Sequence, residues 1–351
     1  MLSLLDFIYS IFLPLLFRID PERAHRLTIS FLKSLPQRGL HDPPELRTSV
    51  FGLSFSNPLG LAAGMDKDGV ALKGWETLGF GFAEIGTVTP RPQSGNPRPR
   101  IWRLTDHHAL INRMGFPSKG MDRVAPSLSR TAALRIGVNL GPNRDTPPSR
   151  VPDDYAALAR RFAKRCDFIV INLSSPNTPG LRDFQVPERM RTVIEAIRLA
   201  SSEIGTERPL LIKVAPDIQP AMMADICGTA IQLGLAGIVA TNTSLDHAAL
   251  GVASNLEGGL SGEPLKLRSR EAIAHIHQFT RGRMPIIGVG GIASAEDAYG
   301  HLQAGASLVE LYTGLIYHGP GLVRRIKSEL RELLIRDGFR SITEAVGRAV
   351  C

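Results

Sequence analysis

The chain has 351 residues, of which 43 % are hydrophobic and 21 % are charged. This composition is typical of a folded globular protein and excludes a disordered or collagen-like chain. The length allows two domains, but α/β barrels often exceed about 250 residues as one unit, so a single large core fits equally well. Lysine and arginine outnumber the acidic residues by 41 to 33, which gives a formal net charge of +8.

The basic residues are scattered among acids, as around Arg98 and Arg100, and form no block of five or six like charges. Aromatic residues make up 6 % of the chain, and the sequence has no zinc-finger spacing or other nucleic-acid-binding signature. We therefore expect no nucleic-acid partner. The cysteines, Cys166, Cys227 and Cys351, lie far apart without a CxxC pair, which favours reduced thiols in a cytosolic compartment.

Residues 1–17 are almost wholly apolar, and here the composition changes most sharply. The run lacks the basic start and the small-residue cleavage site of a signal peptide. It contains Asp6 and Pro14 and ends at Arg18, so it is too short to cross a bilayer comfortably.

A second helix is expected directly after this run. Asp20 can cap a helix whose first residue is Pro21 and which extends to about residue 34. Two short helices with apolar faces and basic flanks predict an anchor that lies on a membrane surface, within an N-terminal segment of residues 1–40. Packing of both helices on the main domain is the alternative.

The rest of the chain alternates apolar runs with amphipathic stretches. Eight runs, continuous in Val, Ile, Leu and Ala, predict strands buried on both faces, as in a parallel sheet covered by helices. The predicted strands are residues 58–63, 82–87, 136–140, 168–173, 210–215, 237–241, 285–289 and 308–312. The predicted helices between them include residues 154–164, 188–202, 221–233, 265–279 and 295–303.

Eight such units predict an α/β fold, a closed (β/α)₈ TIM barrel over residues 46–336, preceded by the short helical extension and followed by a tail at 337–351. The connection at 88–133 is much longer than the others and is rich in Pro, Arg and Gly. We expect this connection to cover the mouth of the barrel.

Polar residues follow nearly every predicted strand, where a barrel carries its chemistry. They include Lys67, Thr87, Asn139, Asn172, Ser175, Lys213, Thr241, Asn242 and Thr243. No histidine or carboxylate cluster is among them, which argues against a metal site and against hydrolysis by paired carboxylates. Amides, hydroxyls and two lysines instead suit a planar heterocycle, although any single Asn or Thr is equally typical of a turn or cap.

Residues 287–292, IGVGGI, run from the seventh strand into a helix. Glycines let backbone N–H groups approach a phosphate, and in a barrel the loops after strands seven and eight are the usual phosphate site. The same residues fit a Rossmann fingerprint, with Glu310 about 20 residues further on as a ribose ligand. Because six strands precede this one and one follows, the barrel phosphate site is favoured over a dinucleotide fold or purely structural glycines.

Seven segments resemble dihydroorotate dehydrogenases. These are NPLGLAAGMDKDG (57–69), EIGTVTPRP (84–92), NRMGF (112–116), NLSSPNTPG (172–180), ATNT (240–243), GGLSG (258–262) and PIIGVGGI (285–292). The resemblance spans almost the whole chain and is strongest to the membrane-associated, quinone-dependent class, which has an N-terminal extension with a similar DPERAH segment. In that class a serine stands where the soluble class has its catalytic cysteine, and Ser175 occupies this position.

The resemblance implies an FMN at the barrel mouth, with its phosphate at Gly262, Gly291 and the Tyr312-Thr313 turn. Lys213 would lie near the pyrimidine end of the flavin. The implied cofactor residues are Ala63, Gly64, Met65, Asp66, Lys67, Thr87, Asn139, Asn172, Lys213, Thr241, Gly262, Gly291, Tyr312 and Thr313. The implied residues for dihydroorotate are Lys67, Asn112, Arg113, Met114, Gly115, Phe116, Asn172, Asn177, Asn242 and Thr243.

The implied reaction is oxidation of dihydroorotate to orotate in de novo pyrimidine (UMP) biosynthesis. Ser175 would take the C5 proton through a relay, and a hydride would pass from C6 to the flavin. A membrane quinone would then accept the electrons through an apolar passage between the N-terminal helices, near His25, Arg100 and Tyr312. This implies a peripheral protein on the cytoplasmic side of a bacterial inner membrane, for which we expect a monomer.

Other functions remain open from the residues alone. A soluble barrel lyase or isomerase could act on a phosphorylated metabolite without a redox cofactor, and it would lack a flavin absorption band. A flavin-free scaffold could use the hydrophobic N-terminus to bind partners, although the dense polar strand ends speak against it. A soluble dehydrogenase that uses fumarate or NAD is the nearest alternative among oxidoreductases.

Overall fold

The computed structural model describes residues 4–37, 42–128, 133–175, 177, 180–248, 250–252 and 255–350. Eight parallel strands close into a barrel in the order β10-β12-β13-β3-β4-β7-β8-β9. Their bounds are β3 Leu59–Leu61, β4 Phe82–Val88, β7 Arg135–Leu140, β8 Phe168–Asn172, β9 Leu210–Val214, β10 Gly237–Ala240, β12 Ile286–Val289 and β13 Leu308–Leu311. All eight predicted strands and the (β/α)₈ fold are therefore confirmed.

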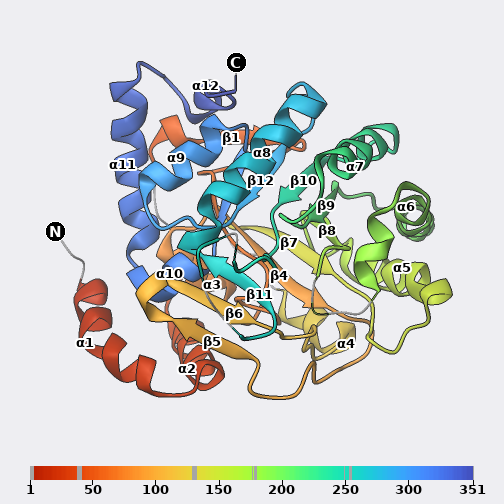
Figure 1. Cartoon of the computed structure of the whole chain (residues 1–351), viewed down its shortest axis with the longest axis horizontal. Helices are drawn as coiled ribbons and strands as arrows, with labels where there is room; N and C mark the ends of the chain where they lie inside the picture. The colour runs from red at the N-terminus through yellow and green to blue at the C-terminus, as the bar shows by residue number, and fades with distance from the viewer. Residues whose placement is uncertain are drawn as a thin grey trace.

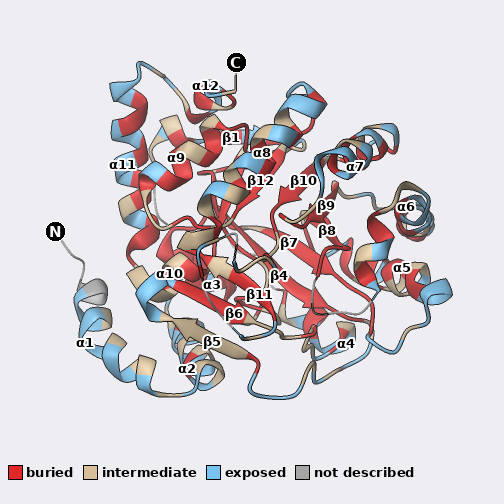
Figure 2. Ribbon diagram, viewed as in Figure 1, coloured by how far each residue is buried: buried red, intermediate tan, exposed pale blue. Residues whose placement is uncertain are grey.

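The strands form because each is a short, continuous apolar run, and every residue of β4, β8 and β9 is buried. Helices surround the barrel, and their exposed faces point outward (Figures 1 and 2). The larger ones are α5 Val151–Phe162, α6 Pro187–Glu203, α7 Pro220–Gln232, α8 Lys266–Thr280, α9 Ala295–Gln303 and α11 Leu322–Arg336. Shorter ones are α3 Leu72–Leu78, α4 Met121–Val124 and α10 Thr313–His318.

Aromatic rings fill the N-terminal end of the barrel interior. The rings of Phe82 and Phe168, from β4 and β8, lie 6.1 Å apart, and Phe55 packs edge-on against Phe82 at 5.5 Å. Phe55 belongs to a hairpin of β1 Thr48–Val50 and β2 Leu53–Phe55, which the apolar pattern does not predict. Apolar side chains thus pack this end of the barrel, and active sites of such barrels lie at the other end.

A small antiparallel sheet lies over the open end. It consists of β5 Ile101–Leu104, β6 Ala109–Asn112 and β11 Gly259–Gly262, with β6 in the middle. The long connection after β4 supplies β5 and β6, as expected of a segment that covers the mouth. β11 comes from residues almost 150 positions later in the chain, and Figure 1 shows the three strands side by side.

The N-terminal extension forms the two expected helices, α1 Leu4–Arg18 and α2 Pro21–Ser34. Asp20 caps α2 as predicted, because its carboxylate accepts a hydrogen bond of 2.9 Å from the backbone N–H of Arg23. α2 packs on α3 and β5, and both helices lie at one edge of the barrel (Figure 1). Across the described ranges, no helix has both the length and the apolar content that crossing a membrane requires.

The C-terminal segment packs against the barrel rather than extending from it. It contains α12 Ile342–Ala345, in which Ile342 is buried, and the N–H of Gly347 donates to Leu302 O at the end of α9. Cys351, the ends of the predicted 1–40 segment and three residues of the NLSSPNTPG motif (Pro176, Thr178 and Pro179) lie outside the described residues.

Candidate active site

A cavity of about 180 Å³ opens at the C-terminal ends of the barrel strands, beneath the antiparallel sheet. Most of the predicted cofactor and substrate residues line it together. They are Ala63, Gly64, Lys67, Thr87, Asn112, Met114, Gly115, Phe116, Asn172, Ser175, Asn177, Lys213, Thr241, Asn242, Thr243, Gly262, Gly291, Tyr312 and Thr313. The cavity also has wall residues outside the predicted cofactor and substrate sets, among them Ser261 and Glu310.

Four polar side chains are hydrogen-bonded to one another along one side of the cavity. Thr87 Oγ1 donates to Asn139 Oδ1 at 2.6 Å, and Asn172 Nδ2 donates to the same oxygen at 3.1 Å. Asn139 Nδ2 in turn donates to Glu84 Oε1 at 2.5 Å. These bonds fix the amide orientations, so Thr87 and Asn172 present defined polar groups to a ligand.

Lys213 lies at the base of the cavity beside two buried carboxyl groups. Its Nζ is 3.3 Å from Glu84 Oε1 and 3.9 Å from Glu310 Oε2. Burial raises the pKa of Glu310 well above its usual value, and the Glu84 charge raises it further against the opposing effect of Lys213. Burial thus favours the protonated form of Glu310, and Glu84 is the carboxyl group nearer to Lys213.

Sequence reasoning missed Glu84 and assigned Glu310 only to the rejected Rossmann fold. The sequence does hold a signal for both, since each is an acidic residue inside a largely apolar predicted strand. Such an acid needs a buried partner, and the partner is Lys213 on a third strand.

Glycines form the opposite wall, where the phosphate is predicted. Gly262 has φ +102°, and a Cβ there would collide with the carbonyl oxygen of His108. A Cβ on Gly291, at φ +71°, would lie 2.5 Å from Lys266 Cα. Both glycines thus pack closely against neighbouring backbone and line the cavity without a side chain. The hydroxyls of Ser261 and Thr313, 2.9 Å apart, add polar groups beside them. This donor set fits a phosphate.

Ser175 lies on the side of the cavity that faces the β5-β6-β11 sheet. Its side chain is buried, and its Oγ accepts a hydrogen bond of 3.3 Å from the backbone N–H of Asn177. Asn177 Nδ2 donates to Asn112 O at 3.3 Å, which joins this loop to the end of β6. Within the described part of the chain, Ser175 Oγ has no bond to a histidine or a carboxylate.

Four predicted residues lie outside the cavity. Asn139 acts behind Thr87 and Asn172, as described above. Asp66 points away from the cavity and accepts hydrogen bonds from Val70 N, Ala71 N and Trp75 Nε1, at 2.9–3.1 Å.

The other two residues outside the cavity are Met65 and Arg113. Met65 faces a second cavity. Arg113 is partly exposed and lies over the Trp102 ring, with its Nη1 3.3 Å from Glu257 Oε2. A direct ligand contact for these four has no geometric support.

The second cavity is larger, about 680 Å³, and lies between the N-terminal helices and the barrel. Its wall is mostly apolar and includes Phe12 and Leu16 of α1 and Phe31 of α2. The predicted passage residues His25, Arg100 and Tyr312 all line it. Lys67 and Tyr312 line both cavities, so they form part of the wall between them.

Burial shifts the pKa values of three polar groups in this wall in the direction that favours their neutral forms. It lowers the pKa of His25 to about 4, with a further contribution from the Lys67 charge, and His25 Nε2 lies 2.6 Å from Met65 O. Burial likewise lowers the pKa of Lys67 to about 8, and Lys67 Nζ donates to Gly64 O at 2.6 Å. Burial raises the pKa of Tyr312 to about 12, so its hydroxyl keeps its proton.

The fold and the cavity are those of a (β/α)₈ enzyme that acts on a small molecule at the C-terminal strand ends. The family profile described as dihydroorotate dehydrogenase matches residues 45–334. The chain is 46 % identical to a dihydroorotate dehydrogenase (quinone) of Acidithiobacillus ferrooxidans, over 97 % of this chain and 99 % of the relative. It is 47 % identical to one of Rhodospirillum rubrum, over 97 % and 94 %.

Solved structures agree with this relationship. The ligand-free DHODH of Eimeria tenella superposes with a TM-score of 0.88 at 38 % identity, over 94 % of this chain and 99 % of that one. The chain therefore belongs to the dihydroorotate dehydrogenase family. The expectation of a flavoprotein oxidoreductase is confirmed at the level of this family, and the lyase alternative finds no support.

Proposed function

We propose that the protein oxidises dihydroorotate to orotate in de novo pyrimidine biosynthesis, with FMN as cofactor and a membrane quinone as electron acceptor. The observation that carries the proposal is the pair of cavities with a shared wall. One lies at the strand ends and is called the polar cavity here because Asn, Thr, Ser and Lys side chains line much of its wall. The other has a more apolar wall and lies beneath α1 and α2. Lys67 and Tyr312 belong to both.

FMN fits the polar cavity by its donor set. The backbone at Gly262 and Gly291, with the hydroxyls of Ser261 and Thr313, would hold the phosphate. Asn172, Thr241 and Lys213 would face the ring system, and Lys213 would bring a positive charge near its pyrimidine end. When bound, FMN supplies a two-electron acceptor for a hydride and passes the electrons on to a quinone.

Dihydroorotate would bind on the side of the cavity beneath the β5-β6-β11 sheet. Its carboxylate and ring amides need both hydrogen-bond donors and acceptors, which Asn112, Asn177 and Asn242 supply. Lys67 lies in the same wall and offers its ammonium group to the substrate carboxylate. The hydroxyl of Thr243 completes this set.

Ser175 would act as the base. The reaction removes a proton from C5 and a hydride from C6, and a C5–C6 double bond forms. Ser175 Oγ takes the C5 proton, while its own hydroxyl proton passes to a water or hydroxyl relay. The hydrogen bond from Asn177 N orients the Oγ, and burial of the side chain excludes bulk water.

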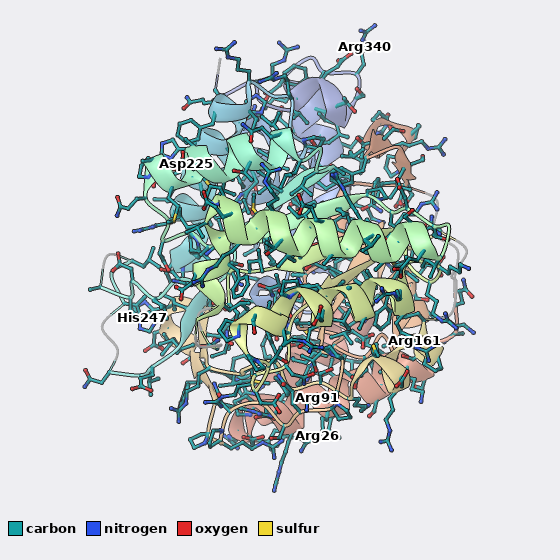
Figure 3. All side chains as sticks on the ribbon, turned by 90° about the vertical axis from the view of Figure 1, so that its right-hand side faces the viewer. Arg26, Arg91, Arg161, Asp225, His247 and Arg340 are labelled. Atoms are coloured by element: carbon teal, nitrogen blue, oxygen red, sulfur yellow. The ribbon has the colours of Figure 1, made fainter. Side chains whose placement is uncertain are left out.

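A quinone would reach the second cavity from the bilayer. α1 and α2 expose large apolar side chains, and the most exposed include Phe7, Ile11, Leu15 and Leu27, at 56–58 %. Figure 3 shows Arg26 of α2 at the lower edge of the molecule, at the opposite end from Arg340. An apolar face with basic neighbours suits a peripheral location on an anionic membrane surface, which for a bacterial protein is the cytoplasmic side of the inner membrane.

In this proposal the chain is a monomer with three parts. These are an anchor and passage segment (1–40), a catalytic barrel (46–336) and a C-terminal tail (337–351).

The test is to purify the full chain, identify a bound flavin by its absorption and mass, and measure dihydroorotate oxidation with a quinone and with a soluble dye as acceptors. We expect FMN and turnover with both acceptors. Absence of the flavin band would favour a lyase or a scaffold, and turnover with fumarate or NAD but not with quinone would favour the soluble type.

A further inference from the structure

His108, Glu263 and His318 form a cluster at the outer rim of the polar cavity. They come from three separate segments: the turn between β5 and β6, the residue directly after β11, and the end of α10. One ligand atom from each lies within 4.8 Å of the other two. The polar strand ends gave no sign of this cluster, because none of the three residues lies at the end of a barrel strand.

The spacing of the cluster is close to that of a metal site. His108 Nδ1 is 2.9 Å and His318 Nε2 is 3.7 Å from Glu263 Oε1. Zinc bonds of about 2.0–2.2 Å to nitrogen and oxygen place neighbouring ligands of a tetrahedral site about 3.3–3.6 Å apart. If the side chains move by a few tenths of an ångström, both measured distances to Glu263 Oε1 therefore fall within this range.

The ring nitrogen of His318 that faces the cluster accepts and donates no hydrogen bond among the described residues. This atom, Nε2, is shielded from solvent, and its distance of 3.7 Å to Glu263 is too long for a hydrogen bond. The His108 ring is held beside it, with ring centroids 5.5 Å apart, and packs on Tyr317 at 5.0 Å. The cluster is thus largely assembled before any ion binds.

We propose that His108, Glu263 and His318 bind a divalent transition metal of the zinc class, with a fourth position left for water. Two imidazoles and one carboxylate favour Zn²⁺, Co²⁺ or Ni²⁺ over Mg²⁺ and Ca²⁺, which prefer all-oxygen sites. The ion would join the β5-β6 turn to α10. It would also neutralise a carboxylate that directly follows Gly262, at the proposed phosphate end of the cavity.

The test is a calorimetric titration of the chelator-treated full-length flavoprotein with Zn²⁺ at pH 7.5, followed by the same titration with Mg²⁺. We expect one saturable equivalent of Zn²⁺ that excess Mg²⁺ does not displace. The double variant His108→Gln/His318→Gln should weaken this binding by at least ~10-fold. His107→Gln is the matched control, because His107 is exposed and outside the cluster, and it should bind as the wild type does.

A second readout follows the ligand set directly. Co²⁺ bound at the site should give visible absorption bands of a four-coordinate ion, and Glu263→Gln should change or abolish them. The proposal is overturned if the wild type has no saturable Zn²⁺ equivalent, if the double variant binds Zn²⁺ as tightly as the wild type, or if Mg²⁺ competes equally.

Discussion

Arg100, the residue directly before β5, forms a two-point ion pair with Glu22 of α2. Nε of Arg100 donates to Oε1 of Glu22 at 2.8 Å and Nη2 donates to Oε2 at 3.0 Å, and the two side chains are only 7 % and 12 % exposed. The hydrogen bond from Arg100 is the largest cause that lowers the pKa of Glu22 to about 2. The pair fastens the N-terminal helices to the barrel at the wall of the apolar cavity.

We predict that Glu22→Gln loosens this attachment. Arg100 would lose charged hydrogen bonds worth about 1.5–3 kcal/mol, so the free energy of unfolding should fall by that amount. The KM for quinone should rise, while turnover with a soluble dye stays nearly unchanged. Arg98→Gln is the control, because Arg98 is 59 % exposed and its loss leaves the Arg100 contact in place. Equal losses with quinone and dye would show that the pair does not act through the quinone passage.

The pKa of His25 predicts how stability depends on pH. The folded protein keeps His25 neutral down to about pH 4, whereas the unfolded chain takes up a proton below about 6.5. Stability is therefore lost as the pH falls through this window. Between pH 7.5 and 5.5 the wild type should lose about 1 kcal/mol more than His25→Gln, measured by urea unfolding. A His107→Gln control should lose as much as the wild type, and equal losses in all three proteins would contradict the prediction.

Gly291 is predicted to be essential for holding the cofactor. Gly291→Ala forces a Cβ to 2.5 Å from Lys266 Cα, which costs about 1–3 kcal/mol and should weaken FMN binding by about 5- to 150-fold. The measurement is FMN release, followed by the rise in flavin fluorescence on dilution. Gly228→Ala in α7 is the control, because a Cβ there meets no atom within 4 Å. FMN retention that is equal in both variants would rule out the glycine turn as the phosphate site.

Glu84 and Glu310 should differ sharply in their response to amide substitution. Burial raises the pKa of Glu310 and favours its neutral form, and Glu310→Gln places a neutral group of the same shape there. The free energy of unfolding should therefore change by less than about 1 kcal/mol. Glu84→Gln removes the charge that faces Lys213 and should cost about 3 kcal/mol. Urea unfolding of both variants tests this order, and a larger loss for Glu310→Gln would contradict it.

The barrel could be predicted from the sequence because its strands are local features. Each is a short apolar run, and α2 begins at Pro21 behind the Asp20 cap, as expected. The cover of the mouth depends on distant contacts instead. β11 pairs with β6, so that Gly259 lies opposite Asn112, and no local pattern in GGLSG signals a strand.

The site residues likewise fall into those that local sequence predicts and those that depend on distant contacts. Strand ends place Asn172 and Lys213 at the cavity because the fold fixes where a strand ends. Asp66 lies in the same kind of position, but its carboxylate folds back onto the backbone N–H groups of Val70 and Ala71, just before α3. Motif membership alone does not determine the direction of a side chain, and the role of Glu84 required knowledge of which strands are neighbours.

The role of Ser175 as the base is tested most directly by the rate at which dihydroorotate reduces the bound flavin. This rate is measured by anaerobic rapid mixing in Ser175→Ala and in the wild type. We predict that the variant retains FMN and that its flavin absorbance is lost about 10²- to 10⁴-fold more slowly than in the wild type. Ser174→Ala, which loses a 3.0 Å hydrogen bond from Asn242, should slow reduction far less. Reduction of Ser175→Ala at the wild-type rate would contradict the assignment of Ser175 as the base.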